Sequence, residues 1–438
     1  MNYNEAMDYL KSLTRFGINL GLSRIEELLR RLADPHRSGL KIVHIGGTNG
    51  KGSTTAMLAG ILHAAGYRVG TFTSPHLHSY TERYMINGMR IAPERAAALL
   101  TELRPHLDAM VSEGYEHPTE FEVSTALAFL YFSREKVDYL LLEVGLGGAI
   151  DSTNVAPSML SIITNVAMDH MDYLGHTIKG IAVVKAGIIK PGVPVVTAAT
   201  GEGLLIIEEI CREKGCRLTR VGQDVTWENI SHTVSGQRFS VAGQKKSYKN
   251  LALKLLGRHQ QVNAATAIAA AENLIDAGAV ISTRDLRSGL ANTLWPGRFE
   301  IISKKPLIII DGAHNYEGAR SLHRSLEDLF PGRGMVLVIG MLGDKEREKV
   351  VGELAPLARA VVVTRPNNPR AGNWQELAVE ASRHAPEVYC CVSVEEAVNK
   401  AISLSGPVEM ICITGSFYLI AEARELLRKS QINIIGTL

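Results

Sequence analysis

Short apolar runs alternate with helix-like segments along most of the chain. Four runs in the first two thirds are four to six residues long and bounded by Gly, Pro or Asn: Lys41–Ile45, Tyr139–Val144, Met159–Thr164 and Val193–Val196. Runs of this kind are typical of central strands in a parallel sheet, which is covered on both faces. After the first run, apolar residues recur at helical spacing, which predicts a helix from about Ser53.

The pattern divides the chain into two parts. Between Cys216 and Lys254 the segments become shorter, more polar and alternating, which predicts an antiparallel excursion on the edge of the first part. Beyond Trp295–Gly297 the strand–helix alternation restarts. Five strands are expected there: Leu307–Ile310, Met335–Ile339, Ala360–Thr364, Glu387–Cys391 and Glu409–Thr414. We therefore predict two α/β domains, residues 1–296 and 297–438, with a ligand cleft between them.

Composition excludes several classes of protein. The 438 residues exceed what one core usually serves, and 46% hydrophobic with 21% charged residues is ordinary for a soluble globular protein. A net charge of +2 lacks the basic excess of a dedicated nucleic-acid binder. The most apolar long stretch, Ala264–Ile281, contains Glu272 and Asp276, so we expect an amphipathic helix and not a membrane span.

Cysteine usage and the first residues indicate the compartment. The five cysteines form neither a disulfide framework nor a zinc-like spacing, so free thiols in a reducing compartment are expected. Residues 1–5 lack the basic and apolar regions of a signal peptide. We expect a cytoplasmic protein without nucleic-acid or membrane partners. No heptad run argues for an oligomer, so a monomer is expected.

The strongest chemical signal is the segment Gly46–Ser53, GGTNGKGS, between a predicted strand and a predicted helix. Amide groups of a glycine-rich turn before a helix cradle phosphate oxygens, and Lys51 adds a cation near the β- and γ-phosphates. The segment departs from the general GxxxxGK[ST] pattern, because Ile45 replaces the first glycine and Gly52 separates Lys51 from Ser53. A turn that only reverses the chain is the alternative. The complete order of strand, loop, lysine, hydroxyl and helix favours phosphate binding.

Two further polar residues stand where predicted strands end. Glu143 closes one apolar run ahead of a glycine-rich stretch, and His170 follows another run. Strand carboxyl ends face the ligand crevice of open α/β sheets, and a carboxylate there suits Mg²⁺. A solvated acid at Glu143 and a hydrogen-bonding histidine at His170 are the alternatives.

More short motifs follow in a fixed order along the chain. They are Ser74–Leu77, Thr81–Arg83, Glu143–Gly148, Asp151–Asn154, Asp169–His170, Lys185–Ile188, Gly257–Gln260, Asn263, Gly297–Arg298, Asp311–Asn315 and Gly415–Ser416. With the loop Gly47–Ser53, their joint order and spacing resemble the folylpolyglutamate synthase and dihydrofolate synthase family of the Mur ligase superfamily, over almost the whole chain. The resemblance implies a P-loop-containing α/β domain of the Mur ligase central type, followed by a Rossmann-like C-terminal ligase domain.

The resemblance also implies roles for single residues. The residues that match the ATP site are Thr48, Asn49, Gly50, Lys51, Gly52, Ser53, Asn263, Arg298 and Asp311. The magnesium ligands would be Ser74, Glu143 and His170, with Lys185 holding a second Mg²⁺ if it is carbamylated as in the family. Phe121, Asp151 and His314 match substrate-binding positions. Lys51, Glu143, His170 and Lys185 are the expected catalytic groups.

The function implied is ATP-dependent addition of L-glutamate to a folate through an acyl phosphate. Activity on dihydropteroate, as a second or sole activity, is an alternative, and a ligase of cell-wall precursors is a weaker one. The family usually carries a basic residue where this chain has Ala149. That departure supports a further alternative, a nucleotide-binding regulator without catalysis. Phe121 and Lys185 also have ordinary alternatives, as a core aromatic and as a solvated helix lysine.

Overall fold

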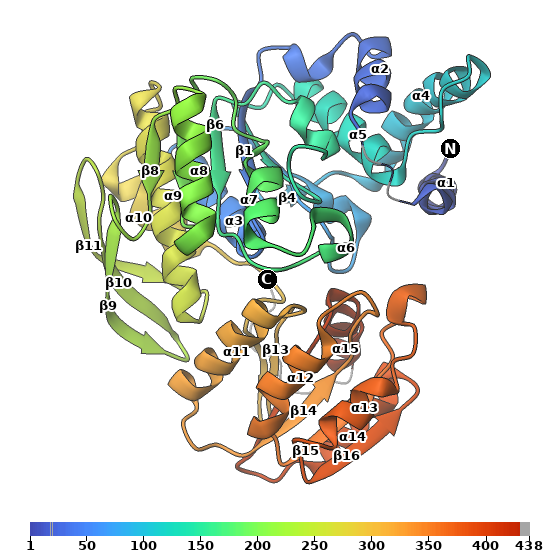
Figure 1. The fold of residues 1–438 in the computed structure, drawn as a ribbon, viewed down its shortest axis with the longest axis vertical. Helices are drawn as coiled ribbons and strands as arrows, with labels where there is room; N and C mark the ends of the chain where they lie inside the picture. Colours follow the sequence, from blue (N-terminus) through green and yellow to red (C-terminus); the bar gives the residue numbers. More distant parts are fainter. Residues whose placement is uncertain (18, 20, 430–438) are drawn as a thin grey trace.

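The chain forms two α/β lobes (Figure 1). The structure is a computed structural model, and it describes residues 1–17, 19 and 21–429. The last nine residues of the predicted second domain, 430–438, lie outside the described residues. The first lobe holds an eight-stranded and a three-stranded sheet, and the second lobe holds a six-stranded sheet. No helix of the described residues is long and apolar enough to cross a membrane.

The large sheet of the first lobe is parallel from β2 to β8. Its strand order is β4 (Met89–Arg90), β3 (Tyr84–Ile86), β2 (Val69–Phe72), β5 (Tyr139–Glu143), β1 (Lys41–Gly46), β6 (Leu160–Ile163), β7 (Val195–Thr197) and β8 (Leu218–Arg220). The β3 and β4 strands add an antiparallel edge. Because β1 is central, its side chains enter opposite cores: Val43 and Ile45 face one, and Ile42 faces the other.

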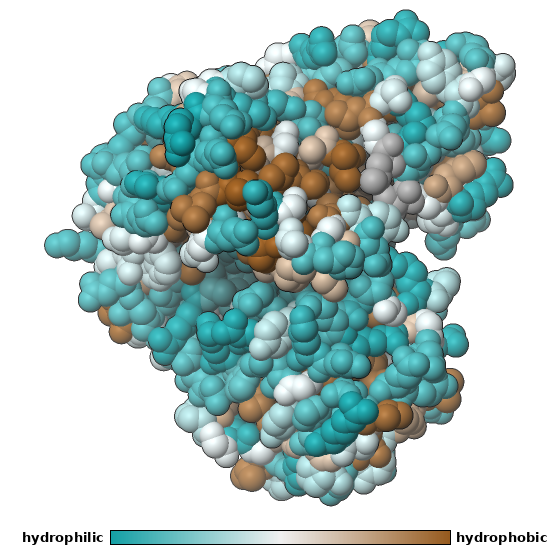
Figure 2. Space-filling model, viewed as in Figure 1, coloured by the Kyte–Doolittle hydropathy of each residue, from teal (hydrophilic) through white to brown (hydrophobic). Residues whose placement is uncertain are grey.

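Helices cover both faces of this sheet. One face packs against α3 (Lys51–Ala64), α9 (Arg258–Asp276) and α10 (Thr283–Asn292). The other face packs against α1 (Tyr3–Leu13), α2 (Ser23–Arg31), α4 (Pro93–Ser112) and α5 (Glu120–Arg134). Beyond β6 lie α6 (Met171–Leu174), α7 (Ile178–Ala186) and α8 (Gly201–Glu213). Over α7, apolar side chains gather at the surface (Figure 2), where Val183 is exposed. Coverage on both faces explains why these strands are continuous apolar runs.

The polar excursion forms a separate antiparallel sheet of β9 (Thr226–Thr233), β10 (Gly236–Ala242) and β11 (Ser247–Leu253). Phe239 and Leu251 of this sheet share a core with the alanines of α9. The helix expected to be amphipathic is therefore buried on most sides, between the large sheet and the small one. The alanines allow close approach from both directions.

The second lobe carries a sheet in the order β12 (Glu300–Lys304), β13 (Leu307–Ile310), β17 (Met410–Thr414), β14 (Met335–Ile339), β15 (Ala360–Thr364) and β16 (Glu387–Cys391). One face packs against α11 (Tyr316–Leu329), α12 (Arg347–Leu354) and α13 (Glu376–Ala381), and the other against α14 (Val394–Leu404) and α15 (Phe417–Lys429). All pairs are parallel except β12 with β13. This is a Rossmann-like lobe.

Several predicted bounds differ from the structure. The helix expected from about Ser53 begins at Lys51, and the strand expected at Val193–Val196 runs from Val195 to Thr197. The second sheet has six strands, because β12 adds an antiparallel edge that the five-strand prediction omitted. Short 3₁₀ helices occur at Thr14–Phe16, Pro35–Arg37, Tyr80–Arg83, Ser152–Val155, Ala355–Leu357 and Pro369–Ala371. The two lobes meet across a groove (Figure 2).

Candidate active site

The glycine-rich loop lies between β1 and α3, at the carboxyl end of the large sheet. Lys51 Nζ donates to the carbonyl oxygens of Gly47 and Thr48, at 3.0 and 3.1 Å, so the ammonium lies over the loop. Gly47 has φ +131°, and a Cβ there would lie 2.0 Å from Thr164 Oγ1. Gly50 has φ +84°, and a Cβ there would meet the Asn263 amide oxygen at 2.4 Å. The glycines are needed both for backbone angle and for close approach.

The end of β6 holds this loop in place. Asn165 Oδ1 accepts from the amides of Thr48 and Asn49, at 3.1 and 2.8 Å. Thr164 Oγ1 donates to the carbonyl oxygen of Asn49 at 2.7 Å. Thr48 Oγ1 donates to the Ala167 carbonyl and accepts from the Ala167 amide. The neighbouring strand therefore determines the shape of the loop, and α3 directs its N-terminus, the positive end of the helix dipole, toward it.

Glu143 lies at the carboxyl end of β5, beside Ser74. The Ser74 amide is 3.4 Å from Glu143 Oε2, and only 4% of Glu143 is exposed. Burial raises the pKa of Glu143 to about 7, against the opposing effect of the Lys51 and Arg298 charges. Within the described part of the chain no cationic side chain is bonded to this buried carboxylate, so it suits a site for Mg²⁺.

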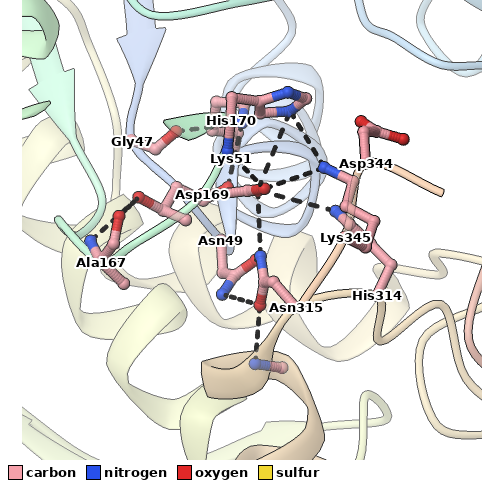
Figure 3. Close-up of polar contacts among 12 residues, drawn as sticks. Gly47, Asn49, Lys51, Ala167, Asp169, His170, His314, Asn315, Asp344 and Lys345 are labelled. Carbon is pink, nitrogen blue, oxygen red and sulfur yellow. Dashed lines mark hydrogen bonds and ion pairs between the residues drawn. The ribbon is translucent and has the colours of Figure 1, made fainter. Parts of the chain in front are cut away.

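A polar network around Asp169 joins the two lobes (Figure 3). Lys345 Nζ of the second lobe lies 2.8 Å from Asp169 Oδ1, and both side chains are buried. The same ammonium is 3.5 Å from His170 Nε2, and His314 Nε2 is 3.8 Å from Asp169 Oδ2. Burial alone would raise the pKa of Asp169, but Lys345 and the two histidines outweigh it and hold that pKa well below its ordinary value. His170 itself has φ +50°, and burial lowers its pKa to about 4.

Asn315 connects this network to the glycine-rich loop. Its amide pairs reciprocally with the Asn49 amide, at 3.0 and 3.1 Å, and its Nδ2 also donates to Asp169 Oδ2 at 3.1 Å. The Asn315 oxygen accepts from the Gly318 amide and so caps α11. The helix cap and the interlobe contact are the same side chain.

Lys185 projects from α7 into the first lobe near the loop. Burial lowers its pKa to about 7, and the Lys51 charge adds to this effect. Only 4% of the residue is exposed, and among the described residues its ammonium has no hydrogen-bond or ion-pair partner. The solvated-lysine interpretation is therefore wrong.

The remaining predicted nucleotide residues lie around the lobe boundary. Asn263 in α9 faces Gly50, and its Nδ2 donates to Gln260 Oε1 at 3.0 Å. The guanidinium of Arg298 lies 4.3 Å from the centroid of the Phe417 ring. Asp311 is buried, which raises its pKa, and its two oxygens accept from the amides of Phe299 and Ala313 at 2.8 Å.

A cavity of about 350 Å³ opens between the lobes. Ser74, Phe121, Asp151, His170 and His314 line it, so five predicted site residues share one space. Among the described residues, those that line the cavity do not include Lys51 or Glu143. The first lobe also contributes Gly17, Asn19 and Gly21 to the wall, and the second contributes residues 415–418.

The carboxylate of Asp151 is bonded to backbone amide groups of the cavity wall. Its carboxylate accepts from the Leu146 and Thr153 amides, at 2.7 and 3.0 Å, and so closes the glycine stretch that follows β5. Ile150 and Asp151 line the cavity, whereas Ala149 is in tight contact with Gly187. The residue that departs from the family pattern thus packs against the end of α7.

Three residues of the site had no assigned role in the sequence interpretation: Asn165, Lys345 and Arg370. Asn165 is one residue past the end of an apolar run, and that position was the available signal. Both Lys345 and Arg370 line the cavity. Lys345 lies in a charged loop of the second lobe and Arg370 in the 3₁₀ helix Pro369–Ala371, and the polar sequence around each is typical of solvated surface.

The chemistry of the donor set fits magnesium only in part. Among residues 1–17, 19 and 21–429, no group of three or more His, Cys, Asp or Glu side chains could hold a metal ion. Glu143 and Ser74 offer the oxygen donors that Mg²⁺ prefers, while an imidazole at His170 is a less usual ligand. These residues fit a metal that also takes oxygens from a nucleotide phosphate.

Comparisons with known proteins agree with this architecture. The Mur ligase middle domain matches residues 45–271, and the Mur ligase glutamate ligase domain matches residues 297–417. A dihydrofolate synthase/folylpolyglutamate synthase of Bacillus subtilis is 38% identical over 429 residues, covering 97% of this chain and 99% of the relative. A folylpolyglutamate synthase of Lacticaseibacillus casei is 36% identical over 431 residues, covering 98% and 99%.

Solved structures give the same result. Folylpolyglutamate synthase from Thermotoga maritima superposes with a TM-score of 0.84 at 37% identity, over 98% of each chain. The Mycobacterium tuberculosis enzyme complexed with ADP and AMPPCP has a TM-score of 0.90 at 32% identity, over 97% of this chain and 99% of that one. Escherichia coli FolC in complex with DHPP and ADP has a TM-score of 0.88 at 30% identity, over 97% and 98%. The chain therefore belongs to the folylpolyglutamate synthase/dihydrofolate synthase family of the Mur ligase superfamily.

Proposed function

We propose that this protein is an ATP-dependent ligase that joins L-glutamate to the γ-carboxylate of a folate. The observation that carries the proposal is the joint position of the glycine-rich loop and the interlobe cavity. The loop offers Lys51 and the N-terminus of α3 to phosphates, and the cavity beside it is lined from both lobes. ADP and AMPPCP bound to the M. tuberculosis relative support use of a nucleotide.

The chemistry has two steps. The folate carboxylate oxygen attacks the γ-phosphorus of ATP, and the bond to the β-γ bridging oxygen breaks, which gives an acyl phosphate and ADP. The glutamate amine then attacks the acyl carbon, loses a proton, and expels inorganic phosphate as the amide forms. Activation is needed because a carboxylate at neutral pH is a poor electrophile. Substrates that fill the cavity would exclude water, which would hydrolyse the acyl phosphate.

Residues of this chain would carry the binding and charge neutralisation. We assign Lys51 to the transferring phosphoryl group, with Thr48, Asn49, Gly50, Gly52 and Ser53 as the phosphate loop. Arg298, Asn263 and Asp311 would complete the nucleotide site from the lobe boundary. Developing charge on the phosphoryl oxygens is the largest electrostatic demand of such a transfer, and a fixed cation meets it.

Magnesium would be held by Ser74, Glu143 and His170. When bound, Mg²⁺ supplies charge neutralisation and orientation at the phosphates. Lys185 would hold a second ion if carbamylated, and its burial, with no ion pair to it among the described residues, supports that modification. Intact mass of the native protein checks it, since CO₂ adds about 44 Da.

Phe121, Asp151 and His314 are proposed to contact the folate. Phe121 is half-buried in the cavity wall, and a flat aromatic face suits a pterin ring. Dihydropteroate as a second substrate is the other candidate. DHPP bound to the E. coli relative, and relatives named for both activities, support it.

Release of ADP with Mg-ATP and glutamate tests the proposal, run in parallel with tetrahydrofolate and dihydropteroate. Turnover with tetrahydrofolate alone indicates a folylpolyglutamate synthase, and turnover with both indicates a bifunctional enzyme. Turnover with dihydropteroate alone indicates a dihydrofolate synthase. Turnover with neither would contradict the ligase and favour the regulator. We further infer that the protein is cytoplasmic and monomeric. Size-exclusion chromatography with light scattering tests the oligomeric state.

A further inference from the structure

Trp295 lies against the first turn of the P-loop helix. The nearest neighbours of a Cβ placed on Gly52 would be three atoms of the Trp295 indole: Cζ2 at 2.8 Å, Nε1 at 2.9 Å and Cε2 at 3.0 Å. Real Cβ atoms essentially never approach other atoms closer than 3.0 Å. Gly52 is inside α3 and its φ is not positive. The indole, and not the backbone angle, therefore requires a glycine between Lys51 and Ser53.

The same tryptophan begins the segment that enters the second lobe. Gly297 has φ +76°, and the buried Phe299 has φ +41°, a left-handed conformation that is rare for a bulky side chain. The Phe299 amide donates to Asp311 Oδ2 at 2.8 Å, which holds this conformation. Arg298 lies between the two positive-φ residues. The backbone of Gly297 and Phe299 therefore orients the Arg298 side chain, and both residues lie within four positions of Trp295.

A second cavity, of about 630 Å³, lies beside the indole. It is lined by α3, β2, the β3–β4 hairpin, α10 and the linker residues Leu294, Trp295 and Pro296. The ring therefore borders open space, which α3 and α10 also line. A methyl group at position 52 would push the ring toward this space instead of breaking the helix, because alanine is a better helix former than glycine.

We infer that Trp295 is a positioning residue: its indole on Gly52 fixes the first turn of α3, which carries Lys51, relative to Arg298 of the linker. The inference rests on the proposed function, in which these two cations act on one nucleotide. It also gives the departure from the general P-loop pattern a cause. The small residue at position 52 makes room for the ring that connects the phosphate loop to the second lobe.

A double-mutant cycle tests the inference. Gly52→Ala and Trp295→Ala are each expected to lower kcat for ADP release by about tenfold to a hundredfold, since misplacement of catalytic groups by about 1 Å has effects of that size. In the Trp295→Ala background, Gly52→Ala is expected to have no further effect, because the indole that it displaces is gone. Trp295→Phe should recover part of the rate. Equal losses from Gly52→Ala in both backgrounds would overturn the inference, because the glycine would then serve the phosphates alone.

Tryptophan fluorescence gives a readout that needs no turnover. The chain has three tryptophans: Trp227, Trp295 and Trp374. We expect ADP to change the emission of the wild type, of Trp227→Phe and of Trp374→Phe, but not of Trp295→Phe. A full ADP-dependent change in Trp295→Phe would overturn the inference. If no folate is turned over while this pattern holds, the proposed function fails and the positioning role stands.

Discussion

The ion pair between Asp169 and Lys345 offers a direct test of how the lobes are held together. Lys345 Nζ lies 2.8 Å from Asp169 Oδ1, and the side chains are 6% and 7% exposed. Lys345→Met keeps most of the volume and leaves the Asp169 carboxylate buried without its cation. Loss of one partner of a buried pair typically costs about 3–5 kcal/mol. Asp169 keeps hydrogen bonds from Asn315 Nδ2 and the His170 amide, so we expect the lower end, about 3 kcal/mol.

Two further variants separate the charge from the packing. Asp169→Asn in the Lys345→Met background removes the uncompensated charge, and the loss should shrink to about 1 kcal/mol. Lys349→Met is the matched control, since Lys349 pairs with Glu346 at 2.6 Å in the same lobe but is 60% exposed. An exposed pair contributes at most about 1 kcal/mol, so this variant should lie close to the wild type.

The assay is equilibrium urea unfolding without nucleotide, followed by far-ultraviolet circular dichroism. Because the pair joins the lobes, its removal should lower the urea midpoint of the lobe that unfolds first. Lys345→Met and Lys349→Met with the same small cost would refute the reasoning. So would a double variant that is less stable than Lys345→Met alone.

Three other predictions follow from the site and the core. Lys51→Ala should abolish ADP release while the circular dichroism spectrum stays unchanged, and retained turnover would remove its assigned role. Burial lowers the pKa of His44 to about 3, so the folded protein resists a proton that the unfolded chain accepts below about pH 6.5. The free energy of unfolding should therefore fall by about 1.4 kcal/mol for each pH unit below about pH 6.5. His44→Gln should not show this loss when urea unfolding at pH 7.5 is compared with unfolding at pH 5.5. Phe121→Ala should raise KM for the pterin substrate about tenfold and leave KM for ATP unchanged, as a lost aromatic contact implies; an equal rise in both would contradict its place in the pterin site.

The sequence predicts most of the strands that are buried on both faces, but it misses β2, VGTF, whose four residues are all buried inside the sheet. The runs that became β1, β5, β6, β13, β14, β15 and β17 are mostly apolar because helices cover the sheet on each side. The edge strand β16, EVYCC, is only partly buried, and the strand–helix alternation around it was the signal for it. The omitted edge strand β12, EIISK, begins with Glu300 and ends with Lys304, and its partner lies on one side only. This segment forms a strand because it pairs with β13, and the pattern of apolar residues within the segment does not predict that pairing.

The candidate site divides in the same way. Residues next to strand ends and glycine turns, such as Lys51, Glu143 and His170, are found by position, since strand carboxyl ends meet at one edge of the sheet. Lys345 is separated from Asp169 by 176 residues and follows Gly343–Asp344 in a charged loop. Its burial arises only when the lobes meet, so its sequence surroundings resemble solvated surface.

The contacts of one side chain explain why the loop and the second lobe should respond together. Asn315 caps α11, pairs with Asn49 of the phosphate loop and donates to Asp169. Asn165, in the segment that joins β6 to Asp169, accepts from the Asn49 amide of the same loop. A nucleotide that moves the Asn49 amide must therefore break or carry with it the start of α11. Because every polar atom of the Asn315 amide is engaged, carrying α11 along costs less than leaving buried amide groups without partners.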